Sequence, residues 1–267
     1  MKKISLFAVA MAAVVFTACG GKKSASEAEV TDDVKSFEQE QVEAKIKAEI
    51  DSLSSELSKL KQLPIVQEGE NGIQLTPEEK QVKPDYLLDA AVAENATTLA
   101  EKYRLISALT VDKRVAAMYE MPTDAYETAI AKLVADIDDP SFKVLENTEN
   151  IYETSEELYN AMDQNGRINF FWQLAAASLV EEIYVLSQNS EKFLTVFDDE
   201  SASNVTYRVV LLVDAVSRLA AYDPDLEPVA KAVEPLAALN AISLDQLKAQ
   251  IEECKDKIAE ARTALVK

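Results

Sequence analysis

Glycine is so scarce in this chain that it constrains the fold class more than any other feature. The 267 residues include five glycines, and from residue 84 onward Gly166 stands alone. Tight β-hairpins need backbone with positive φ, which glycine supplies at the lowest cost. The same scarcity leaves no P-loop or dinucleotide-binding turn after residue 84. We therefore predict an all-α protein, a multi-helix bundle with a long amphipathic, coiled-coil-like helix near its N-terminus.

The absence of histidine narrows the chemistry. No histidine occurs in the sequence, so imidazole bases, histidine metal ligands and Ser-His or Cys-His nucleophiles are excluded. The two cysteines, Cys19 and Cys254, are too few for a disulfide framework. We predict no catalytic residue, no metal site and no cofactor, and a protein that is not an enzyme.

The N-terminus carries the three parts of a secretory signal peptide. Met1-Lys2-Lys3 is followed by thirteen mostly apolar residues, 4–16, and then by the small residues Thr17-Ala18 before Cys19. Thirteen helical residues cover about 20 Å, which is short of the ~30 Å hydrocarbon core of a bilayer. A cleaved signal peptide is therefore favoured over a transmembrane helix.

The residues that end at Cys19 resemble the lipobox of bacterial lipoproteins. Phe16 stands where leucine is commoner, and the rest of the pattern matches. The resemblance implies that Cys19 receives a thioether-linked diacylglycerol, becomes the new N-terminus after cleavage, and is acylated again on its amine. Two or three acyl chains anchor a protein to a membrane almost permanently. The alternative is an ordinary cleaved signal peptide with an incidental Cys19.

The residues after the cysteine bear on which membrane face is occupied. Gly20 stands where many relatives retained in the inner membrane have aspartate, so the resemblance implies the outer membrane. Some lineages export lipoproteins to the cell surface with an acidic run at this place, but here the residues are Lys22 and Lys23. The expected localisation is therefore the cell envelope, lipid-anchored at the periplasmic face of the outer membrane.

The mature chain is strongly acidic. Lys2 and Lys3 leave with the signal peptide, so 25 basic and 47 acidic residues remain and the formal charge is −22. Such a surface repels nucleic acid, which we exclude as a partner. A hydrophobic content of 48% excludes a disordered chain. The expected partners are the membrane, through the lipid, and a protein of unknown identity.

Composition and proline positions divide the chain into five parts. They are the signal peptide (1–18), a lipidated flexible tether (19–29), a long amphipathic helix (30–63), a linker rich in proline and glycine (64–83) and an α-helical bundle domain (84–267). Within 30–63 the apolar positions Ile46, Ile50, Leu53, Leu57 and Leu60 repeat at coiled-coil spacing. This stripe needs a partner: either the helix packs on the bundle, or it stands as a stalk that pairs with another chain.

Two later segments have distinctive patterns. Residues 168–187 are apolar nearly all round, which predicts the central helix of the bundle. Residues 243–266 have the most regular apolar seam, after a predicted capping box of Ser243 and Gln246. A homodimer through helix 30–63 or helix 243–266 is a further expectation.

Four groups of residues are candidate sites, each with an alternative structural role. Trp172 and Phe170 are the candidate ligand or partner contacts; the alternative is burial of Trp172 in the core. Glu181 could face Asp214 as a carboxylate pair, although a surface or salt-bridged role is commoner. Cys254 is expected to be a buried small hydrophobe, or else an intermolecular disulfide.

The fourth group, the acidic segment that begins at Asp223, has a faint resemblance to a calcium loop. Pro228 stands at the sixth position, where that loop needs glycine, so helix capping by Asp223 before Pro224 is the preferred interpretation.

These observations predict a membrane-anchored, non-enzymatic envelope lipoprotein that acts as an interaction or structural module. The alternative is a ligand-binding accessory lipoprotein of a nutrient-uptake system, with a cleft near Trp172 that recognises a glycan or small molecule. That alternative requires a concave pocket with an exposed aromatic side chain and convergent polar groups.

Overall fold

The computed structural model describes residues 37–60, 63–67, 72–145 and 154–266. All regular elements in these ranges are helical, and none is a β-strand, so the prediction of an all-α multi-helix bundle is confirmed. None of the described helices combines the length and the apolar composition that crossing a bilayer requires. The signal peptide, Cys19 and the tether lie outside the described residues.

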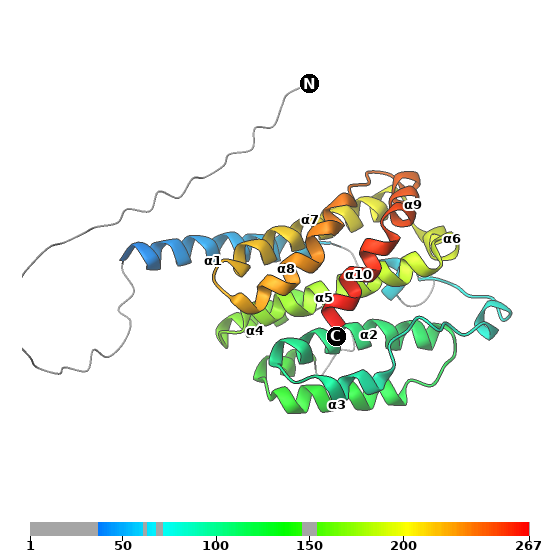
Figure 1. Ribbon diagram of the computed structural model, residues 1–267, viewed down its shortest axis with the longest axis horizontal. Coiled ribbons are helices and arrows are strands. Elements are labelled where there is room, and N and C mark those ends of the chain that lie inside the picture. The colour runs from blue at the N-terminus through cyan, green and yellow to red at the C-terminus, as the bar shows by residue number, and fades with distance from the viewer. Residues whose placement is uncertain (1–36, 61–62, 68–71, 146–153, 267) are drawn as a thin grey trace, which may run out of the picture.

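Ten α-helices are found in the described ranges (Figure 1). They are α1 (Phe37–Ser58), α2 (Leu99–Met118), α3 (Asp124–Ile137), α4 (Ser155–Gln164), α5 (Ile168–Gln188), α6 (Ser190–Phe193), α7 (Asp199–Ala220), α8 (Glu227–Val233), α9 (Leu244–Glu253) and α10 (Lys255–Val266). The 3-10 turns are η1 (Pro64–Val66), η3 (Glu79–Gln81), η4 (Ala90–Asn95), η5 (Pro140–Leu145), η6 (Leu194–Val196), η7 (Pro224–Leu226) and η8 (Glu234–Ala238). Proline stands in the first two positions of η1, η7, α8 and η8, where its missing N–H costs no helical hydrogen bond.

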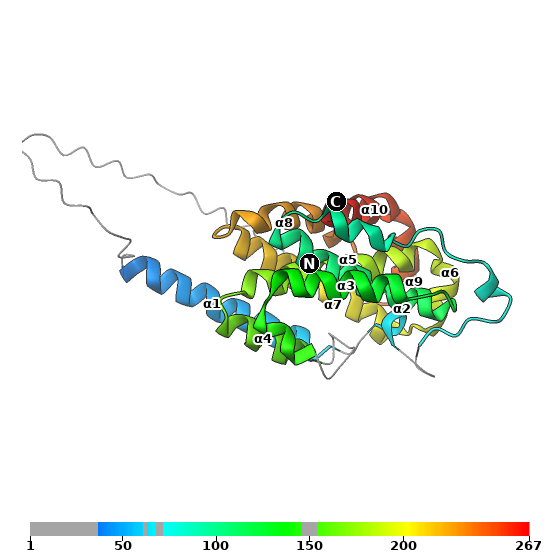
Figure 2. The same cartoon turned by 90° about the horizontal axis from the view of Figure 1, so that it is seen from below.

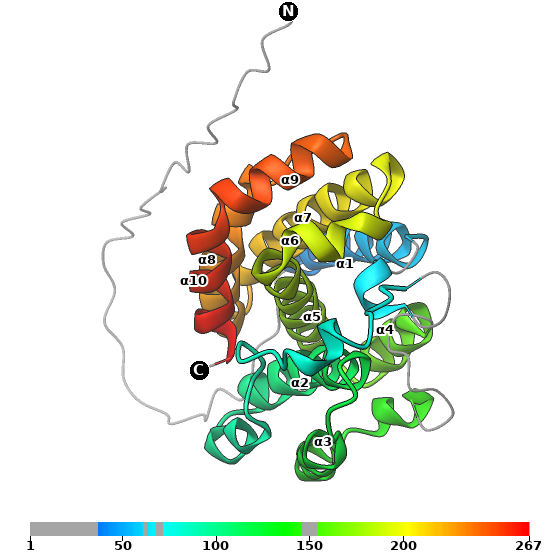
Figure 3. The same ribbon diagram turned by 90° about the vertical axis from the view of Figure 1, so that its right-hand side faces the viewer.

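Helix α5 is the centre of the bundle. Seen end-on, it lies in the middle, with α1, α2, α4, α7 and the C-terminal helices around it (Figure 3). It contacts α2 and α10 most extensively, and also α4, α7, α8 and α9. Side chains from all round α5 are buried, among them Trp172, Leu174 and Ile183. The apolar composition of residues 168–187 thus predicted its position correctly.

Helix α2 packs beside α5 in the same direction. Tyr103 of α2 stacks on Phe170 of α5, and farther along both helices Asp112 lies beside Glu181. Residue numbers therefore rise together in the two helices. A parallel pair requires the intervening chain to return, and α3, η5 and α4 make that return.

Helix α2 begins well inside the bundle domain that was predicted to start at residue 84. Residues 85–89 are irregular, and η4 precedes the helix. The reason is a capping box. The Thr98 hydroxyl accepts from Glu101 N at 3.2 Å, and Glu101 Oε2 accepts from Thr98 N at 2.9 Å. These two bonds satisfy backbone donors at the helix start and set it at Leu99.

Helix α1 packs on the bundle along its C-terminal half. It contacts α7 and α4, and Ile50 is only 1% exposed. Its N-terminal part projects beyond the other helices (Figure 2). The structure therefore shows the first of the two arrangements expected for the apolar stripe of helix 30–63. The helix ends at Ser58 rather than at residue 63, and residues 30–36 lie outside the described ranges.

Part of the predicted linker, 64–83, belongs to the body of the protein. Ile65 and Ile73 are buried, as is the preceding Leu63, and η1 contacts α2 and α5. Proline and glycine break the helix here, but the aliphatic side chains between them still cover the core. The division of the chain at residue 84 is therefore wrong as a structural boundary, because burial overrides the local turn signals.

The C-terminal segment 243–266 forms two helices rather than one. Helix α9 ends at Glu253, and Cys254 separates it from α10. The Ser243 hydroxyl accepts from Gln246 N as predicted, but the Gln246 side chain accepts from Ile242 N, so the box is only half formed. The seam residues Leu247, Ile251, Cys254, Ile258, Ala261 and Leu265 are buried within the same chain. The seam that was expected to pair with a second chain is thus covered by other helices of the same chain.

Candidate functional site

Trp172 does not present a surface for a ligand. Its side chain is 0% exposed, in the core between α5 and its neighbours. Phe170 is partly buried, and its ring stacks on Tyr103 with centroids 4.5 Å apart. The structure therefore favours the alternative, burial in the core, for Trp172. The cause is the central place of α5, which covers the side chains on nearly all its faces.

The aromatic contacts continue into a buried hydrogen-bonded carboxylate. The Tyr103 hydroxyl donates to Asp139, and Ser141 N donates to the same carboxylate at 2.8 Å. Burial alone would raise the pKa of Asp139, but these two donors lower it below its ordinary value. Burial and the neighbouring Asp139 raise the pKa of the Tyr103 hydroxyl. Asp139 therefore fastens η5 to α2.

The densest group of buried charges lies where α2, α5 and α10 meet. Arg262 of α10 makes a bidentate pair with Glu181 of α5: Nε lies 3.0 Å from Oε2, and Nη2 lies 2.9 Å from Oε1. Arg262 Nη2 is also 3.8 Å from Asp112 Oδ2. We refer to Asp112, Glu181 and Arg262 as the charged triad. Glu181 and Asp112 are 1% and 0% exposed, so both carboxyl groups of the triad are closed to solvent, whereas the Arg262 side chain stays 14% exposed.

The carboxylate pair that the sequence suggested is not formed. Glu181 faces Asp112 and Arg262, whereas Asp214 lies on α7 and pairs with Arg218 at 2.8 Å. The sequence contained a signal for Asp112. It shares the buried face of α2 with Leu105, Leu109 and Val115 at helical spacing, where an apolar residue is expected. Sequence reasoning missed it because one acid among 47 attracts no attention without its partner.

A small hollow beside the core is lined by residues of α1, α2, α4, α5 and α7. Its volume is about 60 Å³, and its walls are mostly apolar, with Ser107, Ser178, Glu182 and Arg208 as the main polar groups. The Ser107 hydroxyl has no hydrogen-bond partner among the described residues. Ligand sites usually measure about 300–1,000 Å³, so this hollow has room for a few water molecules rather than a ligand.

A wider groove lies between α1, the start of α5 and the end of α7. Its volume is about 520 Å³, and Tyr222 beside it is 52% exposed. Most of its lining is aliphatic, for example Ile46 and Leu219. Its charged residues, Lys47 and Asp163, bind each other at 3.0 Å. The groove thus offers one exposed aromatic ring without convergent free polar groups.

The acidic segment after α7 caps a turn. The Asp223 carboxylate accepts from Asp225 N at 2.9 Å, with Pro224 in the first turn of η7, and its other oxygen accepts from Asn169. This is the capping role that the sequence favoured over a calcium loop. In the described ranges, no three cysteine, aspartate or glutamate side chains gather in a metal-binding arrangement.

The cysteines have separate positions. Cys254 is buried at the junction of α9 and α10, and burial raises the pKa of its thiol. This is the small-hydrophobe role rather than an exposed position from which a disulfide to a second chain is accessible. Cys19, the predicted lipidation site, is not among the described residues.

Fold and buried sites together define an all-α helical bundle in which the two carboxyl groups of the charged triad are enclosed. Comparison with protein-family models, with curated proteins and with solved structures gave no match, so functional inference rests on the residues of this chain alone.

Proposed function

We propose that this chain is a membrane-anchored envelope lipoprotein that acts as a non-enzymatic interaction or structural module at the periplasmic face of the outer membrane. The observation that carries the proposal is Cys19, placed after a short apolar segment and small residues in a lipobox pattern. Acyl chains on this residue would confine the bundle to the membrane surface.

The described part of the chain is compatible with a role that needs no chemistry. Glu181 and Asp112 are enclosed with Arg262, and Asp139 is held by Tyr103 and Ser141. A general acid or base must reach its substrate, which enclosed carboxyl groups do not. The bundle would therefore contribute a shape and an acidic surface.

The alternative role, a ligand-binding accessory of nutrient uptake, is not adopted. It was based on Trp172, which is buried, and on a cleft beside it. The groove next to Tyr222 is of suitable size, but its lining is mainly aliphatic and Lys47 is paired with Asp163. No specific observation on this groove indicates a ligand.

The anchor is tested by labelling the full chain in a bacterial host with a clickable palmitate analogue. The matched variants are Cys19→Ser and Cys254→Ser, which remove the only two cysteines one at a time. Wild type and Cys254→Ser should be labelled and enter the detergent phase on phase partitioning. Cys19→Ser should lose the label and remain in the aqueous phase, because it lacks the Cys19 sulfur that is proposed to carry the lipid.

The anchor would be rejected by either of two results: Cys19→Ser that is still labelled, or wild-type protein that stays in the aqueous phase. The membrane face is tested separately with protease added to intact cells. The bundle should be protected until the outer membrane is permeabilised, whereas cleavage in intact cells would place it on the outer surface.

A further inference from the structure

The charged triad contains more negative charge than its cation can balance. Asp112 and Glu181 are both fully buried, and Arg262 is the only cation that the described residues bring within 4 Å of them. With both acids ionised, one negative charge would remain uncompensated in the core. Buried charge without a partner is strongly unfavourable, and such groups usually take up a proton instead.

The hydrogen bonds show where a proton is needed. Leu88 N donates to Asp112 Oδ2 at 2.7 Å, whereas Asp112 Oδ1 has no donor among the described residues. Asp112 and Glu181 lie within hydrogen-bonding range of each other. Two ionised carboxylates are both acceptors, so a bond between them requires a proton on one. Arg262 already donates to both oxygens of Glu181, which makes Asp112 the better proton carrier.

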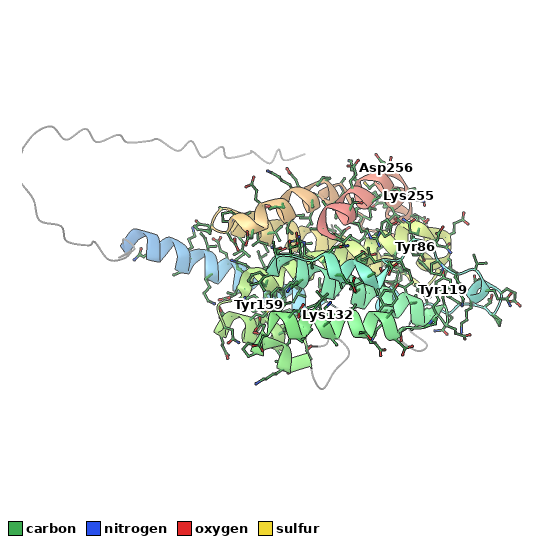
Figure 4. The ribbon with its side chains drawn as sticks, turned by 60° about the horizontal axis from the view of Figure 1, so that its bottom comes forward. Tyr86, Tyr119, Lys132, Tyr159, Lys255 and Asp256 are labelled. Carbon is green, nitrogen blue, oxygen red and sulfur yellow. The ribbon has the colours of Figure 1, made fainter. Side chains whose placement is uncertain are left out.

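The groups that surround the triad add no further positive charge. Tyr86 and Tyr119 lie close together near the end of α2 (Figure 4), and burial is the main cause of a raised pKa for Tyr86. Tyr126 of α3 donates to Leu88 O, and its pKa is raised to about 12, chiefly by burial. The Arg262 guanidinium lies 4.3 Å from the ring centroid of Tyr184. Because their pKa values are raised, the phenols of Tyr86 and Tyr126 are neutral near pH 7 and leave the excess of acids unchanged.

We propose that Asp112 and Glu181 share one proton at neutral pH, and that this proton fastens the C-terminal helix α10 to α2 and α5 through Arg262. Asp112 Oδ1–H donates to the Glu181 carboxylate, which keeps a single negative charge opposite the guanidinium. When pH rises, the proton passes to solvent hydroxide as water, and the two carboxylates then repel each other. The triad is thus a clasp that loosens in alkaline solution.

The sign of the pH dependence follows from the raised pKa of Asp112. Burial is the main cause of the raised pKa of Asp112, and the neighbouring Glu181 carboxyl raises this pKa further. The unfolded chain releases this proton near pH ~3.9. The stabilisation by the clasp is therefore complete below that pH and is lost as pH rises through the folded-state pKa.

The proton is observed directly by infrared spectroscopy, because a protonated carboxyl has its own C=O stretch. The samples are the full chain in detergent, Asp112→Asn, and the control Asp214→Asn, whose carboxyl is partly exposed and paired with Arg218. At about pH 7, wild type and Asp214→Asn should show the band of one protonated acid, and Asp112→Asn should lack it. An asparagine keeps the contacts, since its oxygen accepts from Leu88 N and its amide donates to Glu181.

A wild-type protein without this band at about pH 7, or an unchanged band in Asp112→Asn, would overturn the proposal. If Asp112→Asn does not fold, titration of the wild-type band decides. The band should still have more than half of its low-pH intensity at about pH 7. If the band has disappeared completely by about pH 6, the proposal is overturned.

The mechanical consequence is tested by hydrogen exchange of backbone amides, corrected for the intrinsic effect of pH. Between about pH 7 and pH 9, protection of residues 255–266 in wild type should fall roughly tenfold or more relative to α3, which does not contribute to the triad. In Asp112→Asn, the protection of residues 255–266 relative to α3 should differ by no more than about twofold between the two pH values. Equal protection of α10 at both pH values in wild type would contradict the clasp.

Discussion

The buried side chain of Arg104 is held by partners from distant parts of the chain. Arg104 Nε donates to Leu265 O at 2.7 Å, and its Nη1 donates to Gln173 Oε1 at 2.8 Å. These contacts join α2 to α5 and to the end of α10. A buried donor without a partner costs more than a made bond gains, so such residues specify which helices meet.

Asp139→Asn should destabilise the protein in a pH-dependent way. Because the donors Tyr103 and Ser141 N lower the pKa of Asp139, its stabilisation is present above the unfolded value of ~3.9 and is lost as pH falls through the folded value. The variant should cost about 1–2 kcal/mol at neutral pH, the range of a charge-assisted hydrogen bond. Urea denaturation at about pH 7 and pH 3 measures this difference, which should shrink in acid.

Asp138→Asn is the matched control, since Asp138 is exposed and its left-handed backbone, φ 50°, suits asparagine equally well. It should leave stability nearly unchanged at both pH values. An Asp139→Asn penalty that is equal at both pH values would show that the carboxylate charge is not responsible. The expected slope is opposite to that of Asp112, because the two carboxyl pKa values shift in opposite directions.

At the scale of elements, local sequence signals set where each helix begins and ends. Burial of apolar side chains decided how the helices pack against one another. The Thr98 capping box sets the start of α2, and Gly166, whose backbone φ is 66°, follows the end of α4. The packing of α1 depended on the helices that cover its apolar face, which are α7 and α4. Glu49 pairs with Arg218 of α7 at 2.5 Å, and Asp51 accepts from Tyr159 of α4 at 2.6 Å. These bonds align α1 with two helices that lie far away in sequence.

Ile50→Ala should destabilise the whole protein by about 2–5 kcal/mol, because it leaves a cavity under α1. Ile50 is 1% exposed, whereas Ser52, in the same turn, is exposed. Ser52→Ala is therefore the control and should change stability by less than about 0.5 kcal/mol. Thermal or urea unfolding followed by circular dichroism measures both. An Ile50→Ala penalty no larger than the control would show that α1 is detached from the bundle in solution.

At the scale of the whole molecule, the core is built around an apolar central helix, and the excess of acidic residues lies mainly at the exterior. The core gathers around α5, while the surplus of 47 acidic over 27 basic residues is carried largely outside it. Exposed ion pairs such as Lys47–Asp163 contribute little individually. Repulsion among the remaining acids therefore opposes folding and is the larger electrostatic contribution at low salt.

Salt should therefore stabilise this protein. Raising sodium chloride from about 0.02 M to about 0.3 M shortens the Debye length and screens repulsion among acids. We expect the melting temperature to rise by about 2–6 °C, which corresponds to a gain of one or two kcal/mol. Scanning calorimetry measures it, with sucrose of equal osmolality as the control for non-ionic effects. A fall in melting temperature would mean that surface ion pairs outweigh the repulsion.

The site could be predicted from sequence only in part. Glu181 was recognised as a candidate acid, but its partner was expected to be Asp214. The actual partners, Asp112 and Arg262, come from α2 and α10, and no sequence pattern links positions that are 150 residues apart. Trp172 was correctly placed on the central helix, and its burial followed from the helices that surround α5.

The sequence by itself determined the fold class and the central helix, and it alone supports the proposed localisation of the protein. These depend on local physical properties: the scarcity of glycine, the apolar composition of residues 168–187 and the small residues before Cys19. Only the tertiary structure decided that α1 and Ile65 belong to the body, that the seam of 243–266 is covered, and that Asp112 meets Glu181. Helix pairing depends on which apolar faces bury each other, and that is a property of the assembled core rather than of any one segment.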